Sequence, residues 1–567
     1  MQRFDEMAMP GSAVLFQILF TFLCAYIKST EAVPKKYDMV AVIDVGTAYS
    51  GYAFSTSPDD VQNPENIVLG QWKEGLKTHK VPTSVLYNND LSFYKFGYEA
   101  ENTYEDARTE CSNCKTFVLF RHIKLNLYNT KLDRQVTITD VSGKIQKPLI
   151  DVMADTINYL ISQLRQKSAE HGVNNNGDIK WVLTVPSIWS DQAKQLMREA
   201  TLKKIELEVD IVLSYEPEAA VIALKHMQKE FFQSGVKYMV IDAGGGMIDI
   251  VVHEVQDDGT LREVVASSGG DWGGTRVNDA FESLVETSVG KETFDQFKAD
   301  YIKDYFGLMA AFEYKKRMIS KNKPDIVLDI PDSLIEIIKK PTGTGENSQL
   351  IVDGKGLTLT EEIVFSLFSQ SIKNITNHVS KLVQEPKVKD VSTIVMVGGY
   401  SQCHLLVNAI QNISADVQVI VPNDTAYVLK GAVIYGWNIS MISERVCKYT
   451  YAMPVFGQSG LNEEFVIWVN KGTAVKIDDC LKKKIRNLKL QSYPIFSLYA
   501  STEEECLKGK DCQKIGSIIP KEQYSPGDMH KDMRLDICFG GTEIQADVLV
   551  LHTGRYLGAD CDFLGLA

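Results

Sequence analysis

The sequence predicts an α/β protein built from two lobes, with a smaller β-rich module after them. Two similar segments, residues 39–54 and 238–253, predict the lobes. Each consists of an apolar strand, an aspartate, a glycine turn and a second strand. A third observation predicts the module, since the pattern changes from residue 441 onward to short alternating strands separated by turns. We expect the two similar units to face each other.

Each glycine turn lets backbone N–H groups approach an anion closely, because glycine has no Cβ and tolerates positive φ. Asp44 and Asp242 stand at the ends of the apolar strands that precede these turns. A buried aspartate is costly unless it meets a cation, a water or a hydrogen-bond donor. The two units therefore suggest jaws that close on a metal-bound polyphosphate.

The first unit continues with alternating strands and helices. Residues 180–186 form a short apolar strand pattern that ends at a proline. A helix is expected over 190–201, with Ser190 as its N-cap. A strand at 211–215 leads into a helix whose first turn, 216–218, holds a proline between two glutamates.

The second unit extends to about residue 440. It contains an amphipathic helix around 304–319 and a strand–Gly-Gly–helix turn at 393–402. The tail beyond it alternates as strands do, for example at 465–469 and 533–551. We expect this tail to fold as the β-rich module.

Length and charge limit the kind of protein. A chain of 567 residues is too long for one hydrophobic core, so two to four domains are expected. Sixty Lys and Arg against 73 Asp and Glu give a formal net charge of −13. Since no basic run stands out, we expect no nucleic-acid partner, and any bound anion must be held by local donors.

The N-terminal leader, 1–37, contains an apolar run at 13–27. The run is shorter than the roughly 20 residues of a membrane span and closer to the core of a signal peptide. Asp5 and Glu6 precede it, where a signal peptide carries positive charge. We favour a cytoplasmic location.

The secretory pathway is the alternative, if residues 11–27 act as a signal sequence, and membrane contact is expected only if this apolar segment is retained. In that case the sequons at Asn374, Asn412 and Asn438 would be glycosylated.

Ten cysteines are scattered along the chain, which is not the density of a small disulfide scaffold. Cys111 and Cys114 form a CxxC pair, and no second CxxC or histidine pair completes a zinc set. We interpret the pair as two free thiols in a loop, with a redox or metal role as the alternative.

A series of short motifs resembles the ATPase domain of the seventy-kilodalton heat-shock chaperone family. The motifs are IDVGT (43–47), TVPSIW (184–189), YEPEAA (215–220), IDAGGG (241–246), GGDWGG (269–274) and MVGGYS (396–401). Three further segments resemble the divergent 12A/12B branch of that family: VLKGAVIYG (428–436), SERVCKYTY (443–451) and FGGTEIQADV (539–548). The resemblance covers residues 38–567.

This resemblance implies a two-lobed actin-like (ribonuclease H-like) ATPase fold. It places lobe I at 38–230 and lobe II at 231–440, with a return to lobe I near 425–440. The β-rich module at 441–567 follows, with no room for a helical lid. The implied ligands are ATP or ADP with Mg²⁺, and the implied partner is a protein client that the sequence does not identify.

The resemblance also implies roles for single residues. It makes Asp44 and Asp242 the residues that organise the metal, and Lys124, Glu216 and Asp242 the catalytic ones; Arg121 is the alternative to Lys124. The implied nucleotide contacts are Gly46, Thr47, Ala48, Tyr49, Gly244, Gly245, Gly246, Met247, Glu313, Lys316, Arg317, Gly398 and Gly399. By spacing alone, Glu313, Lys316 and Arg317 would also suit an ordinary solvated ion-pair face.

Two departures from the chaperones affect the chemistry. Ala48 and Met247 stand where the chaperones carry threonine. Losing a positioned donor costs on the order of 10²-fold in rate, whereas backbone N–H groups still bind a phosphate. We therefore expect a chaperone-like protein that binds ATP and hydrolyses it slowly. The alternatives are a pseudo-ATPase interaction scaffold and, with less support, a small-molecule kinase of the same superfold.

Overall fold

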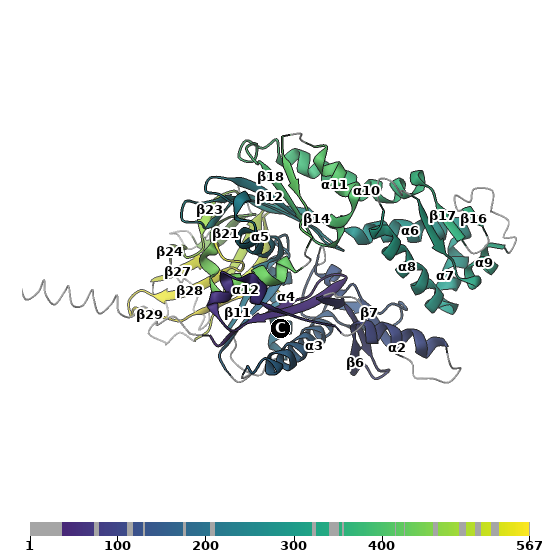
Figure 1. Ribbon diagram of the computed structural model, residues 1–567. Helices are drawn as coiled ribbons and strands as arrows, with labels where there is room; N and C mark the ends of the chain where they lie inside the picture. Colours follow the sequence, from purple (N-terminus) through teal and green to yellow (C-terminus); the bar gives the residue numbers. More distant parts are fainter. Residues whose placement is uncertain are drawn as a thin grey trace, which may run out of the picture.

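The computed structural model describes fifteen stretches of the chain, and every structural statement below concerns them. They are residues 37–72, 79–109, 117–128, 131–173, 177–204, 210–319, 325–339, 351–353, 356–413, 416–423, 426–456, 463–486, 495–504, 512–522 and 532–565. Residues 1–36 of the leader and the Cys111–Cys114 pair lie outside these residues. The described chain forms two α/β lobes and a β-rich module (Figure 1).

The first lobe is organised around a sheet with the strand order β11-β10-β1-β2-β3, and β4 also pairs with β2. Its strands are β1 (Met39–Asp44), β2 (Tyr49–Ser55), β3 (Val68–Leu69), β4 (Lys80–Pro82), β10 (Ile179–Val185) and β11 (Asp210–Tyr215). The expected hairpin is antiparallel β1–β2, and β1, β10 and β11 run parallel. Helices α3 (Leu149–Glu170) and α4 (Asp191–Leu202) bury their apolar faces in the hydrophobic cluster of this sheet.

The second lobe is organised around a sheet with the order β19-β18-β12-β13-β14-β20-β23. Its strands are β12 (Lys237–Ala243), β13 (Ile248–Val255), β14 (Leu261–Gly270), β18 (Thr393–Val397), β19 (Gln418–Ile420), β20 (Ile442–Val446) and β23 (Ala474–Lys476). The second expected hairpin is antiparallel β12–β13. The helices on this side are α6 (Gly274–Val289), α7 (Lys291–Asp300), α8 (Ile302–Arg317), α9 (Asp332–Lys339), α10 (Glu361–Leu382) and α11 (His404–Gln411), and a small sheet holds β15 (Ile326–Asp329), β16 (Ile351–Asp353) and β17 (Gly356–Leu359).

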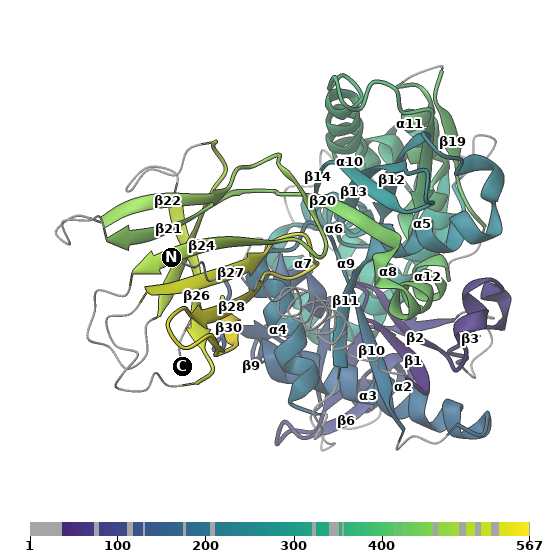
Figure 2. The ribbon, with the colours of Figure 1, turned by 90° about the vertical axis from the view of Figure 1, so that its left-hand side faces the viewer.

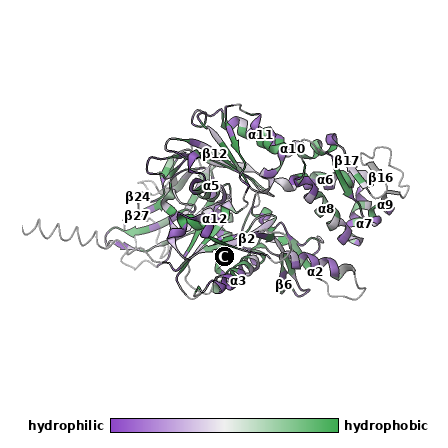
Figure 3. Cartoon of the chain, in the orientation of Figure 1, coloured by the Kyte–Doolittle hydropathy of each residue, from purple (hydrophilic) through white to green (hydrophobic). Residues whose placement is uncertain are grey.

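Two helices, α5 (Glu216–Met227) and α12 (Tyr427–Trp437), pack against each other between the two sheets (Figure 1). A Cβ on Gly431 would stand 1.6 Å from the carbonyl oxygen of Ala219, so only glycine permits this helix contact. Residues of both sheets, including Val42 and Val240, share one hydrophobic cluster with these helices. Figure 3 shows the same concentration of hydrophobic residues in the interior elements. The lobes are therefore joined at their base by a common core.

The outer parts of the lobes also touch. In the first lobe, β5 (Ser84–Tyr87), β6 (Phe93–Phe96) and β7 (Val118–Arg121) form a small sheet beside α2 (Gly97–Thr109). Tyr104 of α2 lies 6.1 Å from Phe306 of α8 between ring centroids, and Arg121 lies 5.3 Å above the Phe306 ring. Because α2 and α8 belong to different lobes, this contact closes the outer rim between them.

The C-terminal module contains two antiparallel sheets around a separate hydrophobic cluster (Figure 2). The first sheet has the order β22-β21-β25-β26-β30 and the second has the order β24-β27-β28-β29. The strands are β21 (Thr450–Phe456), β22 (Glu463–Val469), β24 (Cys480–Arg486), β25 (Phe496–Ser501), β26 (Cys512–Pro520), β27 (Asp532–Cys538), β28 (Gln545–Val550), β29 (Arg555–Tyr556) and β30 (Ala559–Asp562). The expected β-rich tail is thus present.

The beginning of this tail is hydrogen-bonded into the second lobe. Strand β20 pairs in parallel with β14, and β23 pairs antiparallel with β20. The sheet of the second lobe therefore continues past residue 441, where the sequence pattern changes. In the described part of the chain, no helix has the length and apolar character needed to cross a bilayer.

Candidate functional site

The turns of the two hairpins meet between the lobes. A Cβ built on Gly245 would lie 3.3 Å from the Cβ of Ala48, and one on Gly246 would lie 2.8 Å from Thr47 Oγ1. Thr47 and Ala48 follow β1, whereas Gly245 and Gly246 follow β12. The two glycine turns predicted from the sequence therefore lie face to face and in contact.

The N-terminus of helix α6 is hydrogen-bonded to the second turn. The N–H groups of Gly273, Gly274 and Thr275 donate to the carbonyl oxygens of Gly246, Gly244 and Gly245 at 3.2, 3.2 and 2.7 Å. A Cβ on Gly273 would stand 2.5 Å from the Gly245 oxygen, so this close packing requires glycine. The carbonyl groups of the turn are thus occupied.

The amide groups of the turns remain available. Across the described residues, the N–H groups of Gly245 and Gly246 donate to no protein acceptor, and neither do those of Gly46, Thr47 and Ala48. Amides of successive residues in a turn form an anion-binding concavity. Two such groups of amides, one from each lobe, point to a ligand with several anionic oxygens.

Asp44, at the end of β1, is buried and bonded on both oxygens. It accepts from Lys80 Nζ and from Thr184 Oγ1, each at 2.7 Å. Burial by itself would raise the pKa of Asp44, but the charges of Lys80 and Lys124 and the two hydrogen bonds hold it below its usual value. Asp44 is therefore ionised at neutral pH.

Glu216, the first residue of α5, forms an ion pair with Lys124. Lys124 is buried, and its ammonium group lies 5.5 Å from the Trp189 ring centroid. Burial raises the pKa of Glu216, and the charge of Lys124 opposes that rise. The structure thus brings together the two predicted catalytic residues of the first lobe. Arg121, the alternative to Lys124, instead pairs with Glu101 at 3.2 Å near the outer rim.

Asp242 and Asp249 are cross-strand partners on β12 and β13. Burial and the neighbouring carboxylates raise the pKa of Asp242 to about 8. Asp249 accepts from the Ser187 N–H and hydroxyl, both at 2.5 Å, and burial raises its pKa to about 7. Without a cation, the carboxyl groups of the second lobe therefore hold protons more tightly than Asp44 does.

The donor set suits a hydrated Mg²⁺ ion. Mg²⁺ keeps several waters and takes one or two carboxylates together with substrate phosphates. Asp44 and Asp242 offer one carboxylate from each lobe. The charge of a bound cation would offset the unfavourable effect of burial on the ionised carboxylate of Asp242 and so lower its pKa. No ready-made group of three ligating side chains occurs in the described residues, so an ion held wholly by protein is not indicated there.

Three of the predicted nucleotide contacts, Glu313, Lys316 and Arg317, lie on α8 and pair with one another. Glu313 pairs with Lys316 at 2.5 Å and with Arg317 at 2.7 Å. Lys316 is only 6% exposed and also donates to the Gly274 oxygen at 2.9 Å, so this set is not an ordinary solvated face. Arg317 lies 5.4 Å above the ring of Tyr49, which belongs to the first lobe. Arg317 and Tyr49 therefore form another contact between the lobes.

The predicted Gly398–Gly399 turn follows β18. Gly398 has φ +91°, and a Cβ there would stand 2.5 Å from Asp242 Oδ1, so the position requires glycine. A Cβ on Gly399 would meet nothing within 4 Å. Gly399 therefore borders open space, while Gly398 brings the backbone close to Asp242.

The side chain of Met247, a residue of the second lobe, packs against the first lobe. Its chain position is in the second-lobe turn, but its side chain is 6% exposed and belongs to the hydrophobic cluster of the first lobe. The thioether offers only a weak hydrogen-bond acceptor. Met247 therefore links the two turns by apolar packing.

Several polar residues of the site were not singled out from the sequence. Lys80 and Thr184 bind Asp44, Asp249 faces Asp242, and Asn278 accepts from Lys316 at 2.8 Å. Asp249 had a sequence signal, since it is a charged residue inside the apolar strand of the second hairpin. Thr184 is the first residue of the TVPSIW motif, whereas Lys80 and Asn278 occupy positions that no local pattern marks.

Comparisons with known proteins agree with this architecture. The family described as Hsp70 protein matches residues 131–437. Heat shock 70 kDa protein 12A of Mus musculus is 27% identical over 93% of this chain and 91% of its own length. Heat shock 70 kDa protein 12B of Homo sapiens is 26% identical over the same shares of the two chains. Chaperone protein DnaK of Ureaplasma parvum is 25% identical over 70% of this chain and 58% of its own.

These matches confirm the resemblance inferred from the motifs, including the likeness to the divergent 12A/12B branch. They also confirm the actin-like ATPase fold. The family match covers more than half of the chain, with the second turn, Glu216 and helix α8 inside it. This chain belongs to the Hsp70 family.

Proposed function

We propose that this chain is an ATP-binding, chaperone-like protein whose lobes close on ATP or ADP with Mg²⁺, and that it hydrolyses ATP slowly. The observation that carries the proposal is the pair of facing turns, each with backbone amides that bind no acceptor in the described residues. Lys80 and Lys124 add positive charge beside the turns. Such local donors allow an acidic chain to bind a polyphosphate.

Each polar residue of the site has a proposed role. A bound Mg²⁺ would neutralise charge on the phosphate oxygens. Asp44 and Asp242 would hold its water shell from opposite lobes. Lys124 would neutralise a phosphate oxygen, and Glu216, released from its ion pair, would orient the attacking water.

Slow hydrolysis is the expected consequence of two side chains. Ala48 offers no hydroxyl group, and the Met247 side chain packs in the first-lobe cluster instead of donating toward a phosphate. Each lost donor costs about 10²–10³ in rate when it stabilises a transition state. Backbone amides are unaffected by either residue, so binding is retained.

Isothermal titration of the full chain tests the proposal. We expect submicromolar to micromolar binding of ATP and ADP that requires Mg²⁺ and is lost in excess chelator. Absence of binding heat, together with an unchanged melting temperature in saturating MgATP, would contradict it.

Two glycine substitutions sharpen this test. Gly399→Leu places a side chain in the open space beside the site, whereas Gly307→Leu places one on the exposed side of α8, where a Cβ also meets nothing within 4 Å. We expect Gly399→Leu to weaken ATP binding by more than tenfold and Gly307→Leu to leave it unchanged. Equal ATP affinities in the two variants would show that Gly399 does not border the nucleotide site.

A second candidate function, an interaction scaffold that has lost its nucleotide role, is favoured by one observation. The two turns are in contact, and Met247 ties them together, so a phosphate must separate them to enter. A scaffold of this kind would give no titration signal with either nucleotide.

A further inference from the structure

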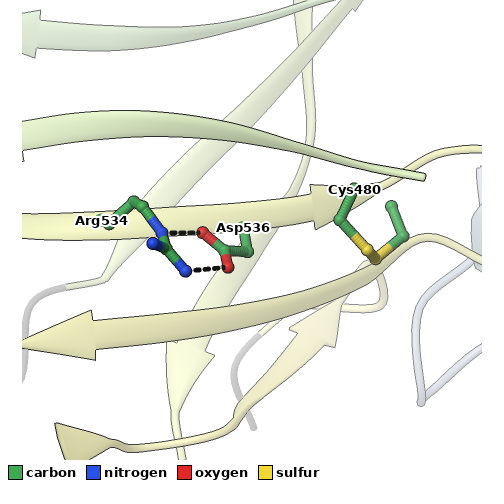
Figure 4. The surroundings of a disulfide bond; sticks show 4 residues. Cys480, Arg534 and Asp536 are labelled. Carbon is green, nitrogen blue, oxygen red and sulfur yellow. Dashed lines mark hydrogen bonds and ion pairs between the residues drawn. A yellow bond between two sulfur atoms is a disulfide. The ribbon is translucent and has the colours of Figure 1, made fainter. Parts of the chain in front are cut away.

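The C-terminal module contains a cross-strand disulfide. Cys480 on β24 and Cys538 on β27 are directly opposed in register, with Cα atoms 4.0 Å apart, and their sulfur atoms are bonded (Figure 4). Cys512 on β26 is disulfide-bonded as well. Cys403 and Cys447, which lie outside the two sheets of the module, are free thiols, and so is the half-buried Cys561 on β30. Disulfide bonding is thus found in the β-rich tail.

The Cys480–Cys538 bond lies on the outer face of its sheet. Residues alternate between the two faces of a strand. Met533, Leu535 and Ile537 of β27 fill the core of the module, so Arg534, Asp536 and Cys538 lie on the other face (Figure 4). Both cysteines are half-buried. A bond within reach of thiol reductants persists where the surroundings are oxidising, and it is reduced in the cytosol.

An independent observation concerns the sequon that begins at Asn438. Asn438 follows α12, and all three sequon residues, Asn438, Ile439 and Ser440, are exposed. The Asn438 side-chain oxygen accepts from the Ser440 N–H at 3.2 Å. Its amide nitrogen, the atom to which an N-linked glycan is attached, donates to no acceptor in the described chain. The folded chain thus accommodates a glycan on Asn438 without losing a bond.

The sequon at Asn374 offers a contrast. Asn374 lies inside helix α10 and accepts from Gln370 at 2.9 Å, and the next residue, Ile375, is fully buried. Two further sequons, at Asn412 and Asn423, end at Ser414 and Thr425, outside the described residues. Among the sequons described in full, Asn438 is the one that is exposed throughout.

The sequence upstream is compatible with entry into the secretory pathway. The apolar run 13–27 has the length of a signal-peptide core. Thr30 and Ala32 then provide small residues two positions apart, as at a signal-peptide cleavage site.

From the disulfide and the exposed sequon together, we infer, in place of the cytoplasmic location favoured from the acidic start of the leader, that this chain folds in the oxidising lumen of the secretory pathway and carries an N-linked glycan on Asn438. Two thiols, Cys480 and Cys538, lose two protons and two electrons to the disulfide of a dithiol oxidoreductase, which is reduced. A lipid-diphosphate oligosaccharide supplies the glycan. Its sugar C1–oxygen bond breaks, a C1–Nδ2 bond to Asn438 forms, one amide proton leaves and the lipid diphosphate departs.

The test uses the full chain, including residues 1–37, expressed in animal cells. Free thiols are alkylated at lysis, and peptides are then analysed by mass spectrometry with and without peptide N-glycosidase. We expect a glycan on Asn438, and a peptide pair linked through Cys480 and Cys538 with neither cysteine alkylated.

Two substitutions of Ser440, two residues after Asn438, serve as matched variants. Ser440→Ala destroys the sequon and Ser440→Thr preserves it, and neither changes the Asn438 side chain. We expect the gel shift produced by N-glycosidase at this site to disappear in Ser440→Ala and to remain in Ser440→Thr. An unmodified Asn438, or alkylated thiols at Cys480 and Cys538 in the isolated chain, overturns the inference. Neither readout depends on nucleotide binding.

Discussion

The two glycine turns differ in their side chains. The first turn carries Thr47, which faces Gly246, and Ala48, which faces Gly245. The second turn carries Met247, whose side chain packs in the cluster of the opposite lobe. Apolar packing of Met247 holds the two turns in contact, whereas a hydroxyl group at this position could donate a hydrogen bond.

Met247→Thr is expected to raise the rate of ATP hydrolysis. The hydroxyl supplies a donor beside the turn amides, and the loss of buried thioether contacts loosens the closed turns. In a single-turnover assay with excess enzyme, we expect a gain of at least tenfold. Met247→Leu is the control, because it keeps the volume and adds no donor, and its rate should match the wild type. A rate for Met247→Thr at or below the wild-type rate would show that this position does not limit hydrolysis.

A second prediction concerns Glu263 on β14, which is buried and accepts from the Val446 N–H at 2.6 Å. Burial raises its pKa to about 8, from 4.5 in the unfolded chain. The folded state therefore holds a proton that the unfolded state releases between these values, so stability falls as the pH rises from about 5 to 8.

Glu263→Gln keeps an acceptor for Val446 but cannot ionise. We expect its free energy of unfolding in urea to exceed that of the wild type at pH 8 by more than about 1 kcal/mol, and the excess to vanish near pH 5. An excess that is the same at both pH values would mean that Glu263 does not titrate in this range.

At the scale of elements, helix α5 connects the site to the start of the C-terminal module. Its first residue is Glu216. Two residues later, the carboxylate of Glu218 accepts two hydrogen bonds from the guanidinium of Arg445 on β20, at 2.9 and 2.7 Å. Arg445 also donates to the Gly540 oxygen at 2.9 Å. One helical turn therefore contacts both the candidate site, through Glu216, and the start of the module, through Glu218.

Arg445→Ala is expected to destabilise the protein by about 3–5 kcal/mol, because it leaves Glu218 buried without its charged partner. Urea unfolding measures this loss. Lys521→Ala is the control, since it breaks an ion pair with Asp560 whose partners are 58% and 68% exposed, and it should cost less than about 1 kcal/mol. The double substitution Arg445→Met with Glu218→Met should recover much of the loss. If Arg445→Ala costs no more than Lys521→Ala, the buried pair is not a stabilising link.

The elements that could be predicted from the sequence are those whose signal is local. The pairs β1–β2 and β12–β13 follow from apolar runs around glycine turns, and the N-cap at Ser190 and the start of α5 follow from their own first-turn residues. Asp44 and Asp242 are predictable because each stands near the end of such a strand.

The remaining features depend on contacts between distant segments. Lys80 reaches Asp44 across 36 positions of the chain, and Cys480 meets Cys538 across 58. Nothing near residue 442 in the sequence indicates that β20 will pair with β14. The sequence marks Met247 as a missing donor, but its burial against the first lobe depends on how the lobes pack together.

At the scale of the whole molecule, the module is fastened to both lobes. Strands β20 and β23 extend the sheet of the second lobe. On the other side, Asp562 accepts from Arg134 at 2.8 Å and from Gln195 at 3.1 Å, and Leu564 joins the hydrophobic cluster of the first lobe. The module is therefore attached to both lobes.

Loosening the first-lobe attachment should uncouple the module from the lobes. In the double variant Asp562→Asn with Leu564→Ala, the pairing with Arg134 is weakened and a buried leucine is truncated, which by itself costs about 2–5 kcal/mol. We expect differential scanning calorimetry to show the module melting several degrees below the lobes, while MgATP still raises the melting temperature of the lobes. Leu551→Ala, which truncates a leucine that is 38% exposed, should leave the calorimetric profile unchanged. A single transition at the wild-type temperature in the double variant would show that the contacts of β20 and β23 alone hold the module in place.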